Sequence, residues 1–230
     1  METHKPNHAL DSDEPEATAT ASWVAKLLRD RIVKGELPPL ARIVERRLSA
    51  ELNVSRTPIR EALKLLQSDG LIEISRNRGA QVTAYKASEA KQLFDVIAML
   101  ESLAARRLTE TIDAPTLDLF EDLHAQMMVF HKIGSAADYF DVNTEIHDLI
   151  VSRCGNPVLE NTHRRLIAQA RRGRYLAIMD PKRLAQAVQE HEILMDAFRA
   201  QDAEAAAAIW HDHLMNTGMS VSDVLKKGAN

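Results

Sequence analysis

Residues 53–70 constrain the fold of this chain most, because they carry a helix with a marked start and a marked stop. Thr57 is the predicted N-cap, and Pro58 suits the first helical turn, where its missing N–H would be unpaired anyway. Apolar residues then recur at three- and four-residue steps up to Leu66, which gives one buried face. Gly70 ends the helix because glycine takes a positive φ without cost. The stretch therefore predicts a short amphipathic helix.

The N-terminal end of this helix is basic and rich in hydroxyl groups. Arg56 and Arg60 flank it, with Ser55 and Thr57 beside them. Guanidinium and hydroxyl groups at the positive end of a helix suit phosphates and guanine edges in a DNA major groove. Taken alone, the same residues also fit an ordinary surface helix, so the neighbouring segments decide between the two readings.

The neighbouring segments complete a winged helix-turn-helix. Residues 43–52 predict a second short helix joined by a tight turn, which is the helix-turn-helix arrangement. Residues 71–74 and 80–84 read as short strands around a basic tip that ends in Gly79, which predicts a hairpin. With a first helix that begins near Thr20–Trp23, residues 20–86 form the predicted DNA-binding domain.

The charge distribution supports DNA binding, although the whole chain has a net charge of -4. Residues 20–86 carry 13 Lys and Arg against 7 Asp and Glu, a balance of +6. Residues 1–19 sum to -4 and residues 87–230 to -6. A basic head on an acidic body is what local phosphate binding requires.

Residues 20–86 resemble the DNA-binding domain of the GntR family of bacterial transcription regulators. The resemblance rests on R-I-V-E-R, L-S-A-E-L-N-V-S-R-T-P-I-R-E-A-L, D-G-L-I and R-G-A-Q-V. One departure is Pro39-Leu40, where the family usually has Pro-Gly before the second helix. The resemblance implies the following DNA contacts: Arg46, Ser55, Arg56, Thr57, Arg60, Arg78 and Gly79.

The rest of the chain predicts an all-α bundle over residues 88–226, so the fold class is mainly α. Breaks such as Gly155-Asn156-Pro157 and Asp180-Pro181 separate the helices. We expect six helices, over residues 88–111, 116–133, 135–153, 157–178, 181–200 and 202–226.

The remaining composition indicates the setting of the protein. Residues 1–19 are polar, acidic and proline-punctuated, and predict a disordered leader without the apolar core of a signal peptide. Cys154 is the only cysteine, which excludes an internal disulfide and a cysteine-based zinc cluster. No apolar run approaches the ~20 residues of a membrane span. We therefore expect a cytoplasmic protein without a membrane partner.

Three histidines fall on predicted buried faces of three different bundle helices. His147 lies on the line from Phe140 to Cys154, His191 on the line from Leu184 to Phe198, and His213 on the line from Ala206 to Thr217. Asn143 lies one turn before His147 on the same face. A buried imidazole needs a partner, and these four residues together predict a divalent-metal site. The competing interpretation is three separate hydrogen-bonded core histidines. His211 points elsewhere and reads as a surface residue, while His124, His131 and His163 stay unassigned.

A second resemblance concerns the bundle. F-D-V-N-T-E-I-H-D-L-I, Q-E-H-E-I-L-M-D-A-F and W-H-D-H-L resemble the C-terminal FCD ligand-binding domain of the FadR branch of the GntR family. Many members hold a divalent metal through one Asp or Asn and three His, which implies Asn143, His147, His191 and His213 as ligands. Imidazole and oxygen ligands suit zinc, nickel or manganese. Many also carry an Arg one turn before the first-helix glutamate, where this chain has Ile97 before Glu101. The substitutes considered are Arg171, Arg172 and Arg174, for which a solvated basic face is the competing interpretation.

The combined expectation is a homodimeric DNA-binding regulator with no enzymatic activity. Its heads would bind a short palindromic operator, and its bundle would bind a small-molecule effector, an organic acid by resemblance, through the metal. Two alternatives use the same histidines: a helical metalloenzyme with a DNA-binding appendage, and a pure metal sensor. For the enzyme we find no convincing general base, since Glu145 lies off the His147 face and Glu190 and Glu192 point away from His191.

Overall fold

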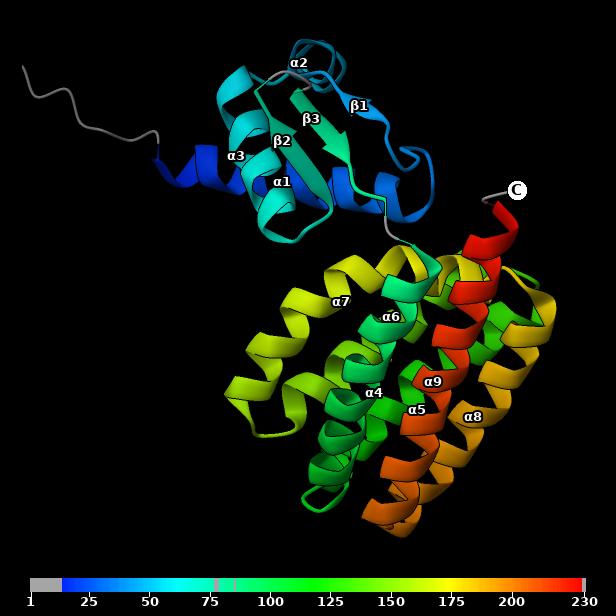
Figure 1. Cartoon of the computed structure of the whole chain (residues 1–230). Coiled ribbons are helices and arrows are strands. Elements are labelled where there is room, and N and C mark those ends of the chain that lie inside the picture. Colours follow the sequence, from blue (N-terminus) through cyan, green and yellow to red (C-terminus); the bar gives the residue numbers. More distant parts are fainter. Residues whose placement is uncertain (1–13, 77–78, 85, 229–230) are drawn as a thin grey trace, which may run out of the picture. The chain divides into compact units, whose positions relative to one another are not determined.

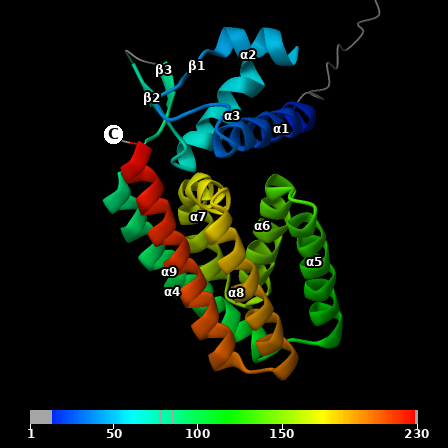
Figure 2. The same cartoon turned by 90° about the vertical axis from the view of Figure 1, so that its right-hand side faces the viewer.

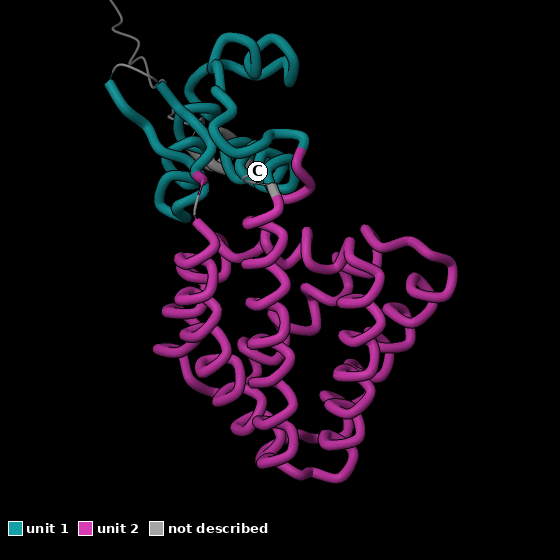
Figure 3. Tube along the Cα trace, turned by 45° about the vertical axis from the view of Figure 1, so that its right-hand side comes forward, with its two compact units in different colours: residues 1–32, 36–83 teal, residues 33–35, 84–230 magenta. Residues whose placement is uncertain are grey.

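The computed structural model describes residues 14–76, 79–84 and 86–228, and the chain divides into two compact units (Figure 1 and Figure 3). The first unit holds the chain up to residue 32 and residues 36–83, and the second holds residues 33–35 and the chain from residue 84 onward. The first is a small winged helix and the second is entirely helical in its described residues. The predicted fold class is confirmed.

The first unit packs three helices against a three-stranded antiparallel sheet in the order β1-β3-β2. In the hairpin, Ile74 pairs with Ala80 and Ser75 with Gly79, so the predicted wing is present. Apolar residues from all three helices and the sheet form one buried core under the helix-turn-helix. The elements are α1 (Glu14–Val33), β1 (Arg42–Ile43), α2 (Glu45–Leu52), α3 (Arg56–Ser68), β2 (Ile72–Ser75) and β3 (Gly79–Val82).

Three local predictions in this unit were wrong. Helix α1 begins at Glu14 rather than near Thr20, so residues 14–19 of the predicted disordered leader are helical, while residues 1–13 lie outside the described residues. Helix α3 begins one residue before Thr57 and its N-cap is Ser55. Ile43 belongs to β1, which pairs with β3, because only two residues form this strand and so short a run has no readable alternation.

The turn before β1 contains a leucine in a conformation that favours glycine. Leu40 has φ 65°, and its side chain is 63% exposed. The Leu40 N–H donates to the carbonyl of Val82 over 3.0 Å, and Gln81 donates to the Leu40 carbonyl over 2.7 Å. These two hydrogen bonds hold the turn against β3. Leucine at position 40, where the family usually has glycine, therefore carries backbone strain at this turn.

The second unit contains six helices among its described residues. Their predicted boundaries hold to within two residues, because side-chain caps and prolines mark several starts. Asp113 accepts from the Thr116 N–H, Asn156 from the Leu159 N–H and Asp180 from the Lys182 N–H. The helices are α4 (Ala87–Thr109), α5 (Ala114–Lys132), α6 (Ala136–Arg153), α7 (Pro157–Ile178), α8 (Pro181–Ala200) and α9 (Ala203–Gly228).

Helices α4 and α9 lie side by side along most of their length (Figure 2). Gly218 permits the approach, because a Cβ at this position would lie 2.6 Å from the Cβ of Phe94. Helix α7 packs against α4, α6, α8 and α9, and therefore borders the interior that these helices enclose. Within the described ranges, no helix is long and apolar enough to cross a membrane.

Candidate functional site

The predicted DNA-contacting residues that the structure describes are all exposed on the first unit. Ser55, Arg56 and Thr57 stand at the start of α3, and Arg60 follows one turn later on the same helix. The Ser55 side chain makes no capping hydrogen bond, so its hydroxyl is not committed to the backbone of α3. The others are Arg46 on α2 and Gly79 at the start of β3, whereas Arg78 lies outside the described residues.

Glu45 contacts one of these candidate residues. Its carboxylate accepts a hydrogen bond from Nε of Arg60 over 2.9 Å, with the Arg60 side chain 60% exposed. An exposed pair of this kind contributes little stability. Because this bond uses only Nε, it restrains the guanidinium without engaging its two terminal nitrogens. Sequence reasoning missed Glu45, whose only signal is its place in the first turn of α2.

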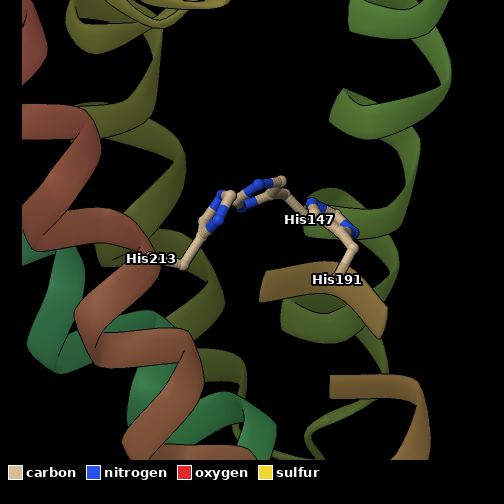
Figure 4. A group of neighbouring side chains, drawn as sticks. All are labelled: His147, His191 and His213. Carbon is tan, nitrogen blue, oxygen red and sulfur yellow. The ribbon is translucent and has the colours of Figure 1, made fainter. Parts of the chain in front are cut away.

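The second unit brings the three predicted histidines together. His147 comes from α6, His191 from α8 and His213 from α9, and their rings converge (Figure 4). One nitrogen from each ring lies within 4.8 Å of the others. Their exposed fractions are 0%, 1% and 2%. The prediction that three separate helices aim one imidazole each at a common point agrees with this geometry.

Two carboxylates orient two of the rings. Nδ1 of His147 lies 2.5 Å from Oε2 of Glu101, and Nδ1 of His213 lies 2.7 Å from Oε2 of Glu190. An ionised carboxylate only accepts, so each Nδ1 carries the proton and each Nε2 keeps its lone pair. A carboxylate behind a histidine in this way is the usual outer support of a metal-ligating imidazole.

Several polar atoms at this site have no hydrogen-bond partner within the described part of the chain. They include Nε2 of His147, Nε2 of His191 and Oδ1 of Asn143, which is 2% exposed. Asn143 precedes His147 by one turn on α6, so both side chains leave the same face of the helix. An unpartnered buried acceptor costs free energy. Three imidazole nitrogens and one amide oxygen match the ligand preferences of zinc, nickel or manganese, so the residues fit a divalent ion.

The protonation states agree with ligation. Burial, with the nearby charge of Arg174, lowers the pKa of His147 to about 3. Burial also lowers the pKa of His191 and of His213, although the Glu190 hydrogen bond partly opposes it for His213. For Glu101, burial raises the pKa, but its interactions with His147 and then with His163 outweigh burial and hold the pKa well below its usual range. At neutral pH the site therefore presents neutral imidazoles and ionised carboxylates.

Glu101 connects more of the interior than its place in the sequence suggests. Besides His147, it accepts hydrogen bonds from Nε2 of His163 over 2.8 Å and from Nε1 of Trp210 over 3.0 Å. The Trp210 ring stacks on that of His213, with the centroids 4.6 Å apart. Sequence reasoning left His163 unassigned and missed the role of Glu101. The available signal was a carboxylate on the apolar stripe of the first bundle helix.

The structure also places three further residues that the sequence analysis considered. His211 is on the surface, as predicted, with its side chain 37% exposed. Ile97 is fully buried one turn before Glu101, so that position offers no charge. Arg174 is only 2% exposed, so the interpretation of this residue as part of a solvated basic face was wrong. Arg174 lies on the buried line of α7 that runs through Leu159, His163, Ala170 and Ala177, so the helical spacing was an available signal of its burial.

Comparisons with known families cover both units. Residues 92–216 match the family described as "FCD domain", and residues 20–82 match "Bacterial regulatory proteins, gntR family". These two matches correspond to the all-helical unit and to the winged helix.

Similar proteins of known name are transcription regulators. An uncharacterized HTH-type regulator from Agrobacterium vitis is 32% identical over 155 residues, which is 66% of this chain and 90% of that protein. The HTH-type transcriptional repressor RspR of Escherichia coli is 24% identical over 208 residues, 90% of this chain and 91% of that protein. Among solved structures, E. coli McbR/YncC has the same fold, with a TM-score of 0.78 at 21% identity, over 92% of this chain and 99% of that one.

Proposed function

The chain belongs to the GntR family of bacterial regulators with an FCD domain, and from that premise we propose a metal-assisted, effector-controlled operator-binding repressor. Its relatives are transcriptional regulators and not enzymes, which removes the metalloenzyme alternative. The observation that carries the sensing part of the proposal is the convergence of His147, His191 and His213, with nitrogens within 4.8 Å of one another.

The winged helix supplies the DNA-binding surface. Arg56 and Arg60 are exposed on the first two turns of α3, where a recognition helix presents side chains to base edges. The helix N-terminus adds a partial positive charge that favours phosphate contacts by Ser55 and Thr57. Arg46 on α2 and Gly79, which begins β3 in the wing, extend this surface beyond α3.

Two features support the proposed homodimer: an exposed apolar stripe on α4 and the small size of a single winged-helix domain. Val96, Met99 and Leu103 recur at three- and four-residue steps and are 49%, 63% and 44% exposed. Exposed apolar side chains on one helix face are typical of interaction sites. A second copy of the chain fits this stripe, because a symmetric pair of small heads reads two half-sites of a short palindrome.

The histidine cluster is the proposed metal centre. His147, His191 and His213 supply three nitrogens, and Asn143 supplies the amide oxygen. A bound divalent ion acts as a Lewis acid that attracts oxygen groups of a small ligand. Glu101 and Glu190 hold the protons on Nδ1 and orient two of the rings. The effector controls DNA binding by linkage. Because it binds one arrangement of the dimer more tightly, it increases the population of that arrangement at the expense of the other.

The sign of regulation rests on relatives rather than on geometry. RspR of E. coli is named a transcriptional repressor. We therefore assign repression, with release of the operator when the effector binds.

Operator binding tests the proposal directly. The full chain is titrated by fluorescence anisotropy against DNA selected from a random pool, with and without zinc and a chelator. We expect specific binding that is lost in Arg56→Ala and retained in Arg165→Ala, a matched exposed arginine on α7. Equal binding by both variants would contradict the DNA-binding surface. Operator release by zinc alone would replace effector sensing with the pure metal sensor.

A further inference from the structure

An acidic side chain lies within the proposed DNA-binding surface. Glu45 stands in the first turn of α2, next to the candidate contact Arg46, and its carboxylate accepts a hydrogen bond from Nε of Arg60 over 2.9 Å. The Glu45 side chain is 35% exposed, so its charge is open to solvent. DNA phosphates repel a carboxylate, so Glu45 lowers the attraction between this surface and any DNA. A carboxylate at this place therefore opposes binding unless it acts on a neighbouring side chain.

Glu45 and Arg60 border one groove of about 510 Å³ in the first unit. Three elements line it: the start of α2, the face of α3 that carries Arg60 and Lys64, and the hairpin at Ile74 and Gly79. Two of these residues, Arg60 and Gly79, are candidate DNA contacts. A DNA strand bound at this groove therefore meets the Glu45 carboxylate and the Arg60 guanidinium together.

The bond to Glu45 determines which N–H groups Arg60 offers to DNA. A guanidinium carries five N–H donors, and the bond to Glu45 uses the one on Nε. The other four belong to Nη1 and Nη2. Two parallel N–H groups match O6 and N7 of guanine in the major groove, and they match two phosphate oxygens as well. Geometry alone therefore does not separate a base contact of Arg60 from a phosphate contact.

Charge separates the two contacts. A guanine edge is neutral, whereas a phosphate carries a negative charge that the Glu45 carboxylate repels. The pair of Arg60 and Glu45 has a net charge of zero, so it displaces little of the counterion atmosphere of DNA. The same pair still donates two hydrogen bonds to a guanine. The carboxylate therefore weakens phosphate binding by Arg60 more than base recognition, and that difference discriminates between DNA sequences.

We propose that Glu45 is a specificity-determining residue of the operator-binding surface. It holds Arg60 through Nε so that Nη1 and Nη2 contact a guanine edge, and it opposes the phosphate contacts that every DNA offers. The result is a lower affinity for non-operator DNA rather than a higher affinity for the operator. This inference rests on the proposed DNA-binding surface and assigns the role of its one paired carboxylate at Arg60.

The test compares Glu45→Gln with the wild-type full chain on two duplexes by fluorescence anisotropy. One duplex is the operator selected from a random pool, and the other is a scrambled duplex of the same length and composition. Glutamine keeps the shape and an oxygen that accepts from Nε, but it removes the charge.

The variant should bind the scrambled duplex more tightly. We expect its affinity for this duplex to rise about fivefold at physiological salt and the salt dependence to steepen by about one unit of slope, because one more positive charge displaces a counterion. Operator affinity should rise less than about twofold, since Arg60 is already committed to a base, so the ratio of operator to non-operator affinity should fall. An unchanged ratio would overturn the proposal.

Glu51→Gln is the matched control. Glu51 lies at the other end of α2 and pairs with Arg31 of α1, which is not a candidate DNA contact, over 2.7 Å. The substitution changes the net charge of the first unit by the same amount as Glu45→Gln. We expect the control to keep the wild-type affinity ratio and salt slope. Equal effects of the two substitutions would overturn the proposal, because they would show a general effect of charge.

A double-mutant cycle with Arg60→Ala separates a role through Arg60 from a structural role. If Glu45 acts through Arg60, Glu45→Gln should leave the affinity ratio of the Arg60→Ala chain unchanged. A full effect of Glu45→Gln in that background would overturn the proposal. So would equal weakening of both duplexes by Glu45→Gln alone, which is the result expected if the carboxylate only stabilises the start of α2. Unchanged binding of both duplexes by Arg60→Ala would instead contradict the proposed DNA-binding surface itself.

Discussion

Glu101 on α4 accepts a hydrogen bond from Nδ1 of His147 on α6 over 2.5 Å, and neither side chain is exposed. The bond fixes the proton on Nδ1, so Nε2, which has no hydrogen-bond partner among the described residues, keeps its lone pair. An arrangement that served only to satisfy a buried histidine would leave no unpaired nitrogen. The relationship therefore favours ligation over a set of separate core histidines.

The first prediction concerns metal content. His147→Ala should purify without the ion that the wild-type chain carries at about one per chain, while His211→Ala should retain it. Glu101→Gln keeps the shape but weakens the orientation of His147, and should reduce metal affinity by about 10–100-fold. Elemental analysis and calorimetry with zinc and nickel measure both effects. Wild-type metal content in His147→Ala would return the histidines to a structural role.

Asn143→Asp tests the remaining ligand. The substitution adds a negative charge at the centre and should tighten metal binding, because an ionised carboxylate is a stronger partner for a divalent cation than an amide. Calorimetry with zinc on this variant measures the change, and unchanged or weaker metal binding would contradict the assignment of Asn143 as a ligand.

Sequence periodicity was enough to locate the three histidines, because each occupies a buried position on a long helix with regular apolar spacing. It could not show that Glu101, His163 and Trp210 meet, since these contacts join α4, α7 and α9 across large sequence separations. The register between helices depends on packing, which no single helix encodes. The burial of Arg174 was missed for another reason: residues 171–174 read as a basic surface by composition, although Arg174 continues the buried line of α7 through His163 and Ala170.

The helix boundaries of the bundle were predictable because caps and prolines act locally. The short strand β1 was not, because two residues carry no alternation and the pairing of Arg42 with Gln81 is set by the tertiary fold. Leu40 is a second case in which the sequence alone does not show the backbone conformation. The sequence marked it only as a departure from a family pattern, whereas its φ of 65° identifies the backbone reason for that pattern.

A second prediction concerns pH and the metal-free protein. The pKa of His147 is lowered by burial to about 3, and those of His191 and His213 are lowered as well. Unfolded histidines titrate near 6.5, so between that pH and the folded pKa the unfolded chain binds more protons than the folded one. The stability of the bundle is therefore fully present above about pH 6.5 and is lost as the pH falls below it. Glu101, whose folded pKa is also lowered, acts in the same direction at lower pH.

Urea denaturation of the chelated protein at several pH values between about 7 and about 5 measures this dependence. His147→Gln should show a shallower loss, because one buried imidazole no longer titrates while the amide still donates to Glu101. Each unit by which a pKa is lowered corresponds to about 1.4 kcal/mol. Stability that stays constant or increases over this acidic range would contradict the prediction.

A third prediction separates base contacts from phosphate contacts. Arg60→Ala should cost about 1–3 kcal/mol of operator affinity and relax the base preference. Arg46→Ala should weaken binding to all sequences alike and reduce the salt dependence by roughly one unit of slope, because one fewer counterion is released. Anisotropy titrations at several salt concentrations distinguish the two patterns. Unchanged affinity in both variants would remove α2 and α3 from the DNA-binding surface.

A fourth prediction concerns assembly through the apolar stripe of α4. Met99→Glu places a charge in the stripe formed by Val96, Met99 and Leu103 and should convert a dimer to a monomer at low micromolar concentration. Val129→Glu changes an exposed apolar residue on α5, which is 56% exposed, and should leave the dimer intact. Light scattering of the two full-length variants reads the result. A monomeric wild-type chain, or a dimeric Met99→Glu variant, would contradict this interface.

The last prediction uses the strained turn of the winged helix. A non-glycine residue at positive φ costs about 1–2 kcal/mol, while glycine adds up to about 1 kcal/mol of chain entropy to the unfolded state. Leu40 has φ 65° and its side chain is 63% exposed, so little packing is lost on its removal. Leu40→Gly should therefore stabilise the first unit by roughly 0.5–1 kcal/mol. Leu65→Gly, a change of the 44% exposed leucine in α3, should destabilise it by about 1 kcal/mol. Hydrogen exchange of peptides from α3 and β3 reports this unit separately from the bundle, with slower exchange expected in the first variant and faster exchange in the second. Faster exchange in Leu40→Gly would show that the hydrogen bonds of Leu40 to Val82 and from Gln81 already offset the strain of this turn.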